Sequence, residues 1–109
     1  MKTPKITLIN DELKAEFARI GEQREVKDPI VVAKFFTPFG SATWWAIAYY
    51  PEENICFGYV TGLFEDEFGY FSINELEEIE LPPFGLRIER DLYFTPCPIS
   101  EIKNKSKLP

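Results

Sequence analysis

Four charged residues combine the side-chain types and the spacing that chemistry would need, and three of them are consecutive. They are Lys34, Glu89, Arg90 and Asp91. A cleft that gathered these groups could transfer a proton or bind a ligand. A structural role is the alternative. In an extended segment Arg90 lies on the same side as Ile88 and Leu92, where it would be partly buried and would hold a carboxylate or backbone carbonyls as a latch. We favour the latch over the cleft.

The composition excludes most enzyme chemistry that depends on histidine, because the chain contains none. Histidine is the usual proton shuttle near neutral pH and the base that activates serine and cysteine nucleophiles. The six glycines are scattered singly and form no phosphate-binding loop. Cys56 and Cys97 are far apart and lack zinc-ligand spacing. We therefore expect no metal and no cofactor, and a non-enzymatic function is favoured over an enzyme.

Charge is sorted along the chain more sharply than the formal net charge of −6 indicates. Between Phe35 and Leu86 there is no lysine or arginine, whereas nine acidic residues lie there. They are Glu52, Glu53, Glu65, Asp66, Glu67, Glu75, Glu77, Glu78 and Glu80. Solvated turns and helix faces explain such a distribution, and a surface for a basic partner is the functional alternative. The sequence leaves open whether these acids form one surface or three.

A protein is the kind of partner that this charge distribution favours. Direct nucleic-acid binding is disfavoured, because the basic residues are few, dispersed and concentrated only near the C-terminal end. A sharper hypothesis is an anti-defence protein whose carboxylates imitate the phosphates of a nucleic acid. The candidate partner surface comprises Glu52, Glu53, Glu65, Asp66, Glu67, Glu77, Glu78, Trp44 and Trp45.

Aromatic residues are abundant, with 17 in a chain of 109 residues. Adjacent residues of a strand point to opposite faces, so Trp44 and Trp45 cannot both enter the same side of a sheet. A tryptophan left exposed would suit a protein contact, whereas packing within the fold is the commoner role. The aromatic residues of the segment 64–71, Phe64, Phe68, Tyr70 and Phe71, are expected to pack over their own loop.

The elements that must position these residues form an α+β fold in one domain, with its core over about residues 8–102 of 1–109. Asn10 is a typical helix N-cap and Gly21 a typical helix stop, while Ser72 and Glu75 have the spacing of a capping box. The expected helices are an N-terminal helix over about 10–20 and a second short helix over about 72–80. The expected strands form an antiparallel sheet centred on 30–61 with a hairpin over 43–61, and a short strand follows near 68–71. Residues 84–94 are expected to form a last strand or an extended segment packed on the sheet.

The two ends of the chain give further expectations. Prolines interrupt the segment 95–102, and residues 103–109 read as a flexible basic tail. No run of apolar residues is long enough for a membrane span, and no signal peptide is visible. We therefore expect a cytoplasmic protein that does not associate with membranes.

Several strings in the chain resemble a known family of small bacterial proteins. The resemblance covers about residues 8–102, and its most specific part is Ile88-Glu89-Arg90-Asp91-Leu92-Tyr93-Phe94. Further matching strings are Asp28-Pro29-Ile30-Val31, Lys34-Phe35-Phe36-Thr37-Pro38, Phe57-Gly58-Tyr59-Val60 and Gly69-Tyr70-Phe71-Ser72. The family is a domain of unknown function that is common on plasmids, phages and other mobile genetic elements. The resemblance therefore implies that this protein is encoded on a mobile genetic element, but it identifies no catalytic residues.

Two functions follow as hypotheses from these observations. The leading one is a non-enzymatic binding or accessory protein of a mobile genetic element that engages a protein partner through an acidic and aromatic surface. The alternative is a small carboxylate-dependent enzyme with a pocket near Lys34, Glu89, Arg90 and Asp91.

Overall fold

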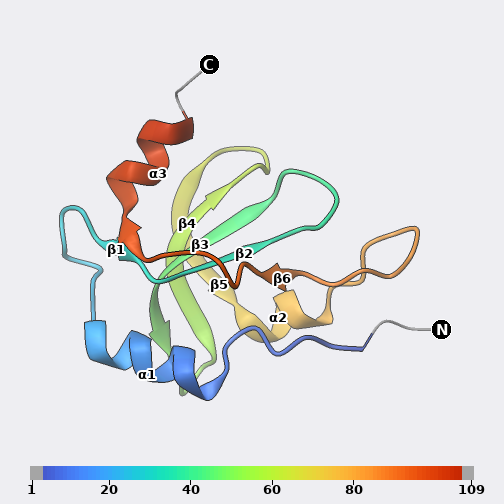
Figure 1. The fold of residues 1–109 in the computed structure, drawn as a ribbon, viewed down its shortest axis with the longest axis horizontal. Coiled ribbons are helices and arrows are strands. Elements are labelled where there is room, and N and C mark those ends of the chain that lie inside the picture. The colour runs from blue at the N-terminus through green and yellow to red at the C-terminus, as the bar shows by residue number, and fades with distance from the viewer. Residues whose placement is uncertain (1–3, 107–109) are drawn as a thin grey trace.

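Five antiparallel strands form the main sheet in the order β5-β4-β3-β2-β6 (Figure 1). The structure is a computed structural model and describes residues 4–106. The strands are β2 (Ala33–Phe36), β3 (Thr43–Tyr50), β4 (Ile55–Thr61), β5 (Glu67–Ser72) and β6 (Glu89–Arg90). A second, two-stranded sheet pairs β1 (Ile30–Val31) with β7 (Cys97–Pro98). The expected antiparallel sheet and its hairpin are confirmed, as is the α+β class.

The β3–β4 hairpin is the centre of the sheet, and a bulge interrupts it. The register shifts between Ala46 and Ala48, so Ala46 pairs with Gly58 while Ala48 pairs with Phe57. Gly58 is required at this point, because a Cβ atom built on it would lie 2.1 Å from the carbonyl oxygen of Trp45. The close approach expected of a strand glycine is therefore present here.

One face of the sheet carries the larger core and is covered by two helices. α1 (Asp11–Ile20) begins at Asn10, whose side chain accepts a hydrogen bond from the backbone N–H of Leu13, and ends at Gly21. α2 (Ile73–Glu78) begins at Ser72, whose hydroxyl accepts from the N–H of Glu75. The buried residues that the helices supply to this core are Leu13, Phe17, Ile73 and Leu76. Both helices expected from capping signals are confirmed.

A third helix, which the sequence reading missed, packs on the opposite face. α3 spans Ile99–Ser106 and contributes Ile99 and Ile102 to a second core cluster with Val31 and Ile47. Its first turn is capped from a distance, since Asp28 accepts hydrogen bonds from both the N–H and the hydroxyl of Ser100. Residues 103–106, expected as the start of a tail, are therefore helical. Residues 107–109 lie outside the described residues.

Candidate functional site

Lys34, Glu89, Arg90 and Asp91 lie at the junction of β2 and β6. The ammonium of Lys34 is 3.7 Å from a carboxylate oxygen of Asp91, and both side chains are about 30% exposed. The N–H of Asp91 donates to the carbonyl of Lys34. Glu89 and Arg90 pair with Phe36 and Phe35 through the backbone, and the side chain of Glu89 points into solvent. Lys34 and Asp91 therefore form a partly exposed ion pair that joins β2 to the segment that follows β6.

Arg87, not Arg90, is the buried arginine of this segment. It is 7% exposed, and its guanidinium donates to the backbone carbonyls of Glu77, Glu78 and Ile79 and to the carboxylate of Glu80. These carbonyls form the C-terminal end of α2, where a cation is favourable. A latch therefore exists with the expected chemistry, but the prediction placed it three residues too late.

The fold divides the candidate acidic surface between opposite ends of β4. Glu52 and Glu53 lie in the turn before β4, next to α2, because the N–H of Ile73 bonds to the carbonyl of Asn54. Glu65, Asp66 and Glu67 follow β4, a strand of seven residues that spans about 20 Å. The α2 acids have partners of their own: Glu77 accepts the N–H of Leu8 and Glu78 pairs with Lys5. The acids therefore do not form one surface.

The two tryptophans do lie on opposite faces, yet neither is an exposed contact residue. Trp44 is only 8% exposed and belongs to the larger core, so it is not an exposed tryptophan. Trp45 is half-buried on the α3 face, where its ring packs against Phe94 and its indole N–H donates to Thr61. Packing explains both residues.

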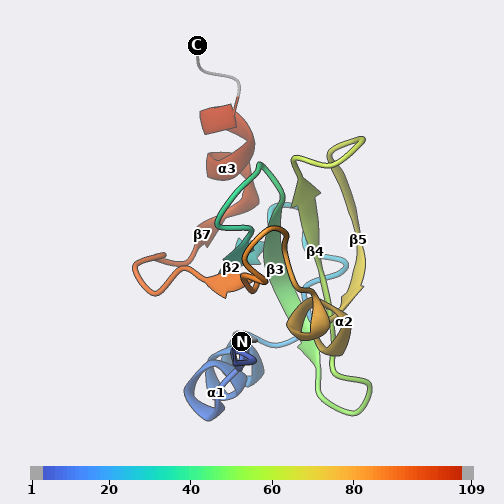
Figure 2. The same cartoon turned by 90° about the vertical axis from the view of Figure 1, so that its right-hand side faces the viewer.

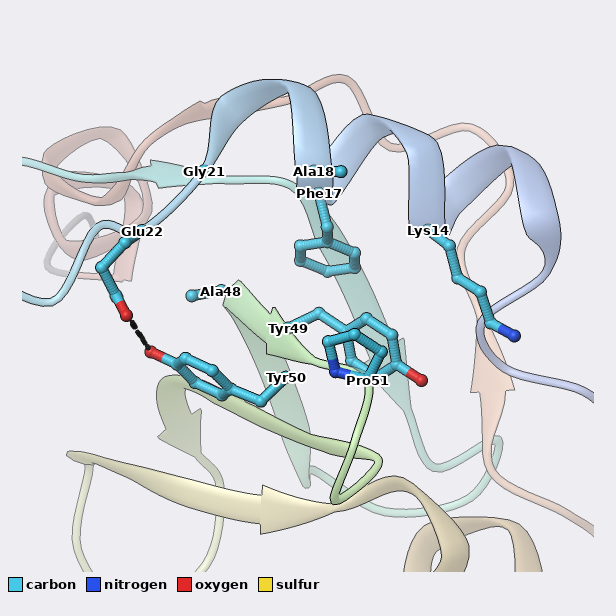
Figure 3. A pocket seen from close by; sticks show the side chains of 9 residues that line it. All are labelled: Lys14, Phe17, Ala18, Gly21, Glu22, Ala48, Tyr49, Tyr50 and Pro51. Atoms are coloured by element: carbon cyan, nitrogen blue, oxygen red, sulfur yellow. Dashed lines mark hydrogen bonds between the residues drawn. The ribbon is translucent and has the colours of Figure 1, made fainter.

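A pocket of about 270 Å³ lies between α1 and the end of β3 (Figure 3). Its walls are mainly apolar, and the hydroxyl of Tyr50 donates to the carboxylate of Glu22 at its rim. Burial and this carboxylate raise the pKa of Tyr50 to about 12. Partial burial by itself would raise the pKa of Glu22, but hydrogen bonds from the N–H of Arg24, Tyr50 and the N–H of Gln23 lower it. Tyr50 stays protonated and Glu22 ionised, which suits a structural bond and not a proton-transferring pair.

The loop between β4 and β5 is held in one shape and presents apolar side chains to solvent. Gly62 has a φ of +83°, and a Cβ atom there would lie 1.8 Å from the carbonyl oxygen of Ser41. The hydroxyl of Ser41 donates to the carbonyl of Gly62, and Asp66 accepts the N–H of Gly62. Leu63 is more than half exposed and Phe64 is fully exposed. The expectation that Phe64 packs over its own loop is therefore wrong.

Beside this loop, a hollow lies on the face of the sheet that carries the larger core. We call this the Gly69 hollow, which measures about 290 Å³. It is lined by Trp44, Val60, Leu63, Phe64, Glu65, Glu67, Gly69 and Phe71, together with the β5 residues Phe68 and Tyr70. Apolar side chains and the carboxylates of Glu65 and Glu67 line it together, and no ion pair within residues 4–106 engages these carboxylates. The sequence predicted the acids as site residues but not Leu63, Gly69 or Phe64, which was expected to pack over its own loop, although two apolar residues directly before three acids were a visible signal.

Sequence comparison places this small α+β domain in a family. The chain belongs to the family described as "Protein of unknown function (DUF2958)", which matches residues 8–106. No curated protein and no solved structure matches the chain. Within residues 4–106, no helix has the length and apolar character needed to cross a bilayer.

Proposed function

We propose that this protein is a non-enzymatic binding module, and that the Gly69 hollow with the β4–β5 loop receives a protein partner that is basic and partly apolar. The carrying observation is the exposure of Leu63 and Phe64 directly beside the carboxylates of Glu65 and Glu67. Large exposed apolar side chains rimmed by charge are typical of protein contact sites. The loop is already shaped by Gly62 and Asp66, so binding would cost little ordering. We further propose that it acts in the setting of a plasmid or phage, as the family resemblance implies.

The sharper hypothesis of nucleic-acid mimicry receives no support from the geometry. A mimic needs a continuous array of carboxylates, whereas these acids lie at opposite ends of β4 and some of them are engaged within the fold. The enzyme alternative also lacks support, since Lys34 and Asp91 form a partly exposed ion pair at the sheet edge. A binding role at the hollow is what the described residues favour.

Capture of partners from a host lysate tests the proposal with matched variants. We expect Phe64→Ala and the double variant Glu65→Gln/Glu67→Gln to lose the captured protein, and we expect capture by the wild type to weaken as salt rises. Phe84→Ala is the matched control, because Phe84 is also exposed but lies in the turn after α2. Glu52→Gln/Glu53→Gln removes the same charge at the opposite end of β4. Equal loss in the loop variants and in their controls would contradict the proposal.

A further inference from the structure

β5 is an edge strand that contains no proline, no lysine and no bulge, and Glu67 at its start is its only charged residue. It lies at one end of the sheet order and, within the described chain, pairs with β4 alone (Figure 2). Natural edges are blunted by shortness, proline, lysine or a bulge. The opposite edge, β6, has only two residues. β5 has six residues, contains neither proline nor lysine, and pairs with β4 without a register shift.

The backbone of β5 presents its unpaired groups at Phe68 and Tyr70. In an antiparallel ladder, residues alternate between those bonded to the neighbouring strand and those whose N–H and C=O point away from it. The N–H of Ile73 donates to the carbonyl of Asn54 in the same register as the β4–β5 ladder. By alternation, Gly69 and Phe71 bond to β4. Phe68 and Tyr70 therefore direct both backbone groups toward the open side.

Gly69 has no role inside the molecule that requires a glycine. Its φ lies outside the left-handed region, and a Cβ atom built on it would meet nothing within 4 Å. Its ladder partner Gly58, in contrast, would clash with the Trp45 carbonyl. Glycine weakens a strand, and in strands it often marks a place where another chain approaches closely. The bare backbone of Gly69 lines the hollow next to Phe71.

We propose that the partner binds as an added β-strand on the open edge of β5, with one apolar side chain entering the Gly69 hollow and basic side chains facing Glu65 and Glu67. This inference rests on the proposed function and specifies its mode. Strand addition draws affinity from main-chain hydrogen bonds and specificity from pockets for alternate side chains. On the opposite face of the edge, the rings of Phe68 and Tyr70 are 41% and 54% exposed. The ammonium of Lys103 lies 4.6 Å from the centre of the Phe68 ring, and Arg24 donates to the Tyr70 hydroxyl, so the basic side chains of the partner belong on the face of Glu65 and Glu67.

Charge favours a basic partner over a second copy of this chain. An antiparallel pairing of two β5 strands centred on Gly69 would place Glu67 of each copy opposite Phe71 of the other. The acidic residues 65–67 of one copy would then approach the start of α2 in the other, where Glu75 and Glu77 lie. Like charges at such contacts oppose association. A basic extended segment meets the same residues with attraction.

Selection from a random library of linear 12-residue peptides displayed on phage tests this inference. We expect the enriched peptides to alternate apolar residues with lysine or arginine. Two matched pairs isolate the backbone: Tyr70→Pro against Tyr70→Ala, and Phe68→Pro against Phe68→Ala. Each pair loses the same ring, but only the proline removes the outward N–H, and an edge strand tolerates proline at such a position. We expect each proline variant to bind at least about tenfold more weakly than its alanine counterpart.

The outcomes separate the binding mode from the proposed function. Peptides that need Phe64 and Glu65 but bind proline and alanine variants equally would overturn strand addition and leave the proposed function standing. Peptides unaffected by Phe64→Ala and by Glu65→Gln/Glu67→Gln, or no enrichment at all, would overturn both. A wild-type dimer in sedimentation that Tyr70→Pro makes monomeric would replace the basic partner with a second copy and overturn the inference. Thermal unfolding of each variant verifies that it is folded.

Discussion

Alanine at two glycines that pair with each other in the β4–β5 ladder should have opposite effects on stability. At Gly58 the new Cβ atom would lie 2.1 Å from the Trp45 oxygen and 3.1 Å from Cε1 of Phe71. The contact is with backbone in the bulged hairpin, so the strand itself must shift to relieve it. Overpacking of this kind costs about 1–3 kcal/mol or more. At Gly69 the same atom meets nothing within 4 Å.

The expected magnitudes follow from these contacts. Gly58→Ala should lower the free energy of unfolding by about 2 kcal/mol, because the clash outweighs the smaller gain from a stiffer unfolded chain. Gly69→Ala should raise it by about 0.5 kcal/mol, because only that gain applies. For a chain of 109 residues, these changes correspond to a Tm lower by about 8 °C and higher by about 2 °C.

Urea unfolding followed by circular dichroism, with a thermal scan beside it, measures both variants. The wild-type urea dependence serves as the reference, and an unchanged slope ensures that the two variants are compared on the same transition. Gly69→Ala should also weaken peptide binding, since its methyl group enters the hollow. A loss of stability at Gly69 as large as that at Gly58 would refute the reasoning, because it would mean that Gly69 has a structural role within the molecule.

Two further predictions concern the latch and the α1 pocket. Arg87→Met should lower the free energy of unfolding by about 2–4 kcal/mol, because it leaves the carbonyls at the end of α2 without a donor. Arg90→Met should lower it by less than about 1 kcal/mol. Urea unfolding of both variants measures the difference. Tyr50 has a pKa raised to about 12, so it should contribute to a fall in stability as pH rises from about 10 through 12. Tyr50→Phe should make this fall smaller and reduce the late-titrating phase of tyrosine absorbance, to which Tyr49, whose pKa is also raised by burial, contributes. A Tyr50→Phe protein with an unchanged alkaline titration would contradict the second.

Local signals in the sequence were sufficient for the elements that cap or pair with near neighbours. Asn10 and Ser72 cap their helices through bonds to residues three positions away, and the hairpin over 43–61 closes through a short turn. α3 could not be found in this way. Its cap is Asp28, 72 residues from Ser100, and its apolar residues gain their stability from the far face of the sheet. Prolines before it suggested loop instead.

The candidate site shows the same division between local and distant information. The alternation of side chains in an extended segment predicted that Arg90 is the buried arginine. In the structure the chain passes the end of α2 at Arg87, so Arg87 is the arginine that bonds to the carbonyl of Ile79. The acids were visible as residues, whereas the position of the α2 acids relative to the two ends of β4 depends on how α2 packs in the fold. The sequence alone does not show that a side chain fits at Gly69 but clashes at Gly58. Only the bulge next to Trp45 distinguishes them.

Hydrogen exchange of the β5 amides, measured by NMR with and without an enriched library peptide, tests the partner-binding edge most directly. In the protein alone, the amides of Phe68 and Tyr70 should exchange faster than those of Gly69 and Phe71, which bond to β4. Binding should slow exchange at Phe68 and Tyr70 by about tenfold or more. Unchanged exchange at these two amides, with new protection around Phe17 and Tyr49 in the α1 pocket, would contradict the account.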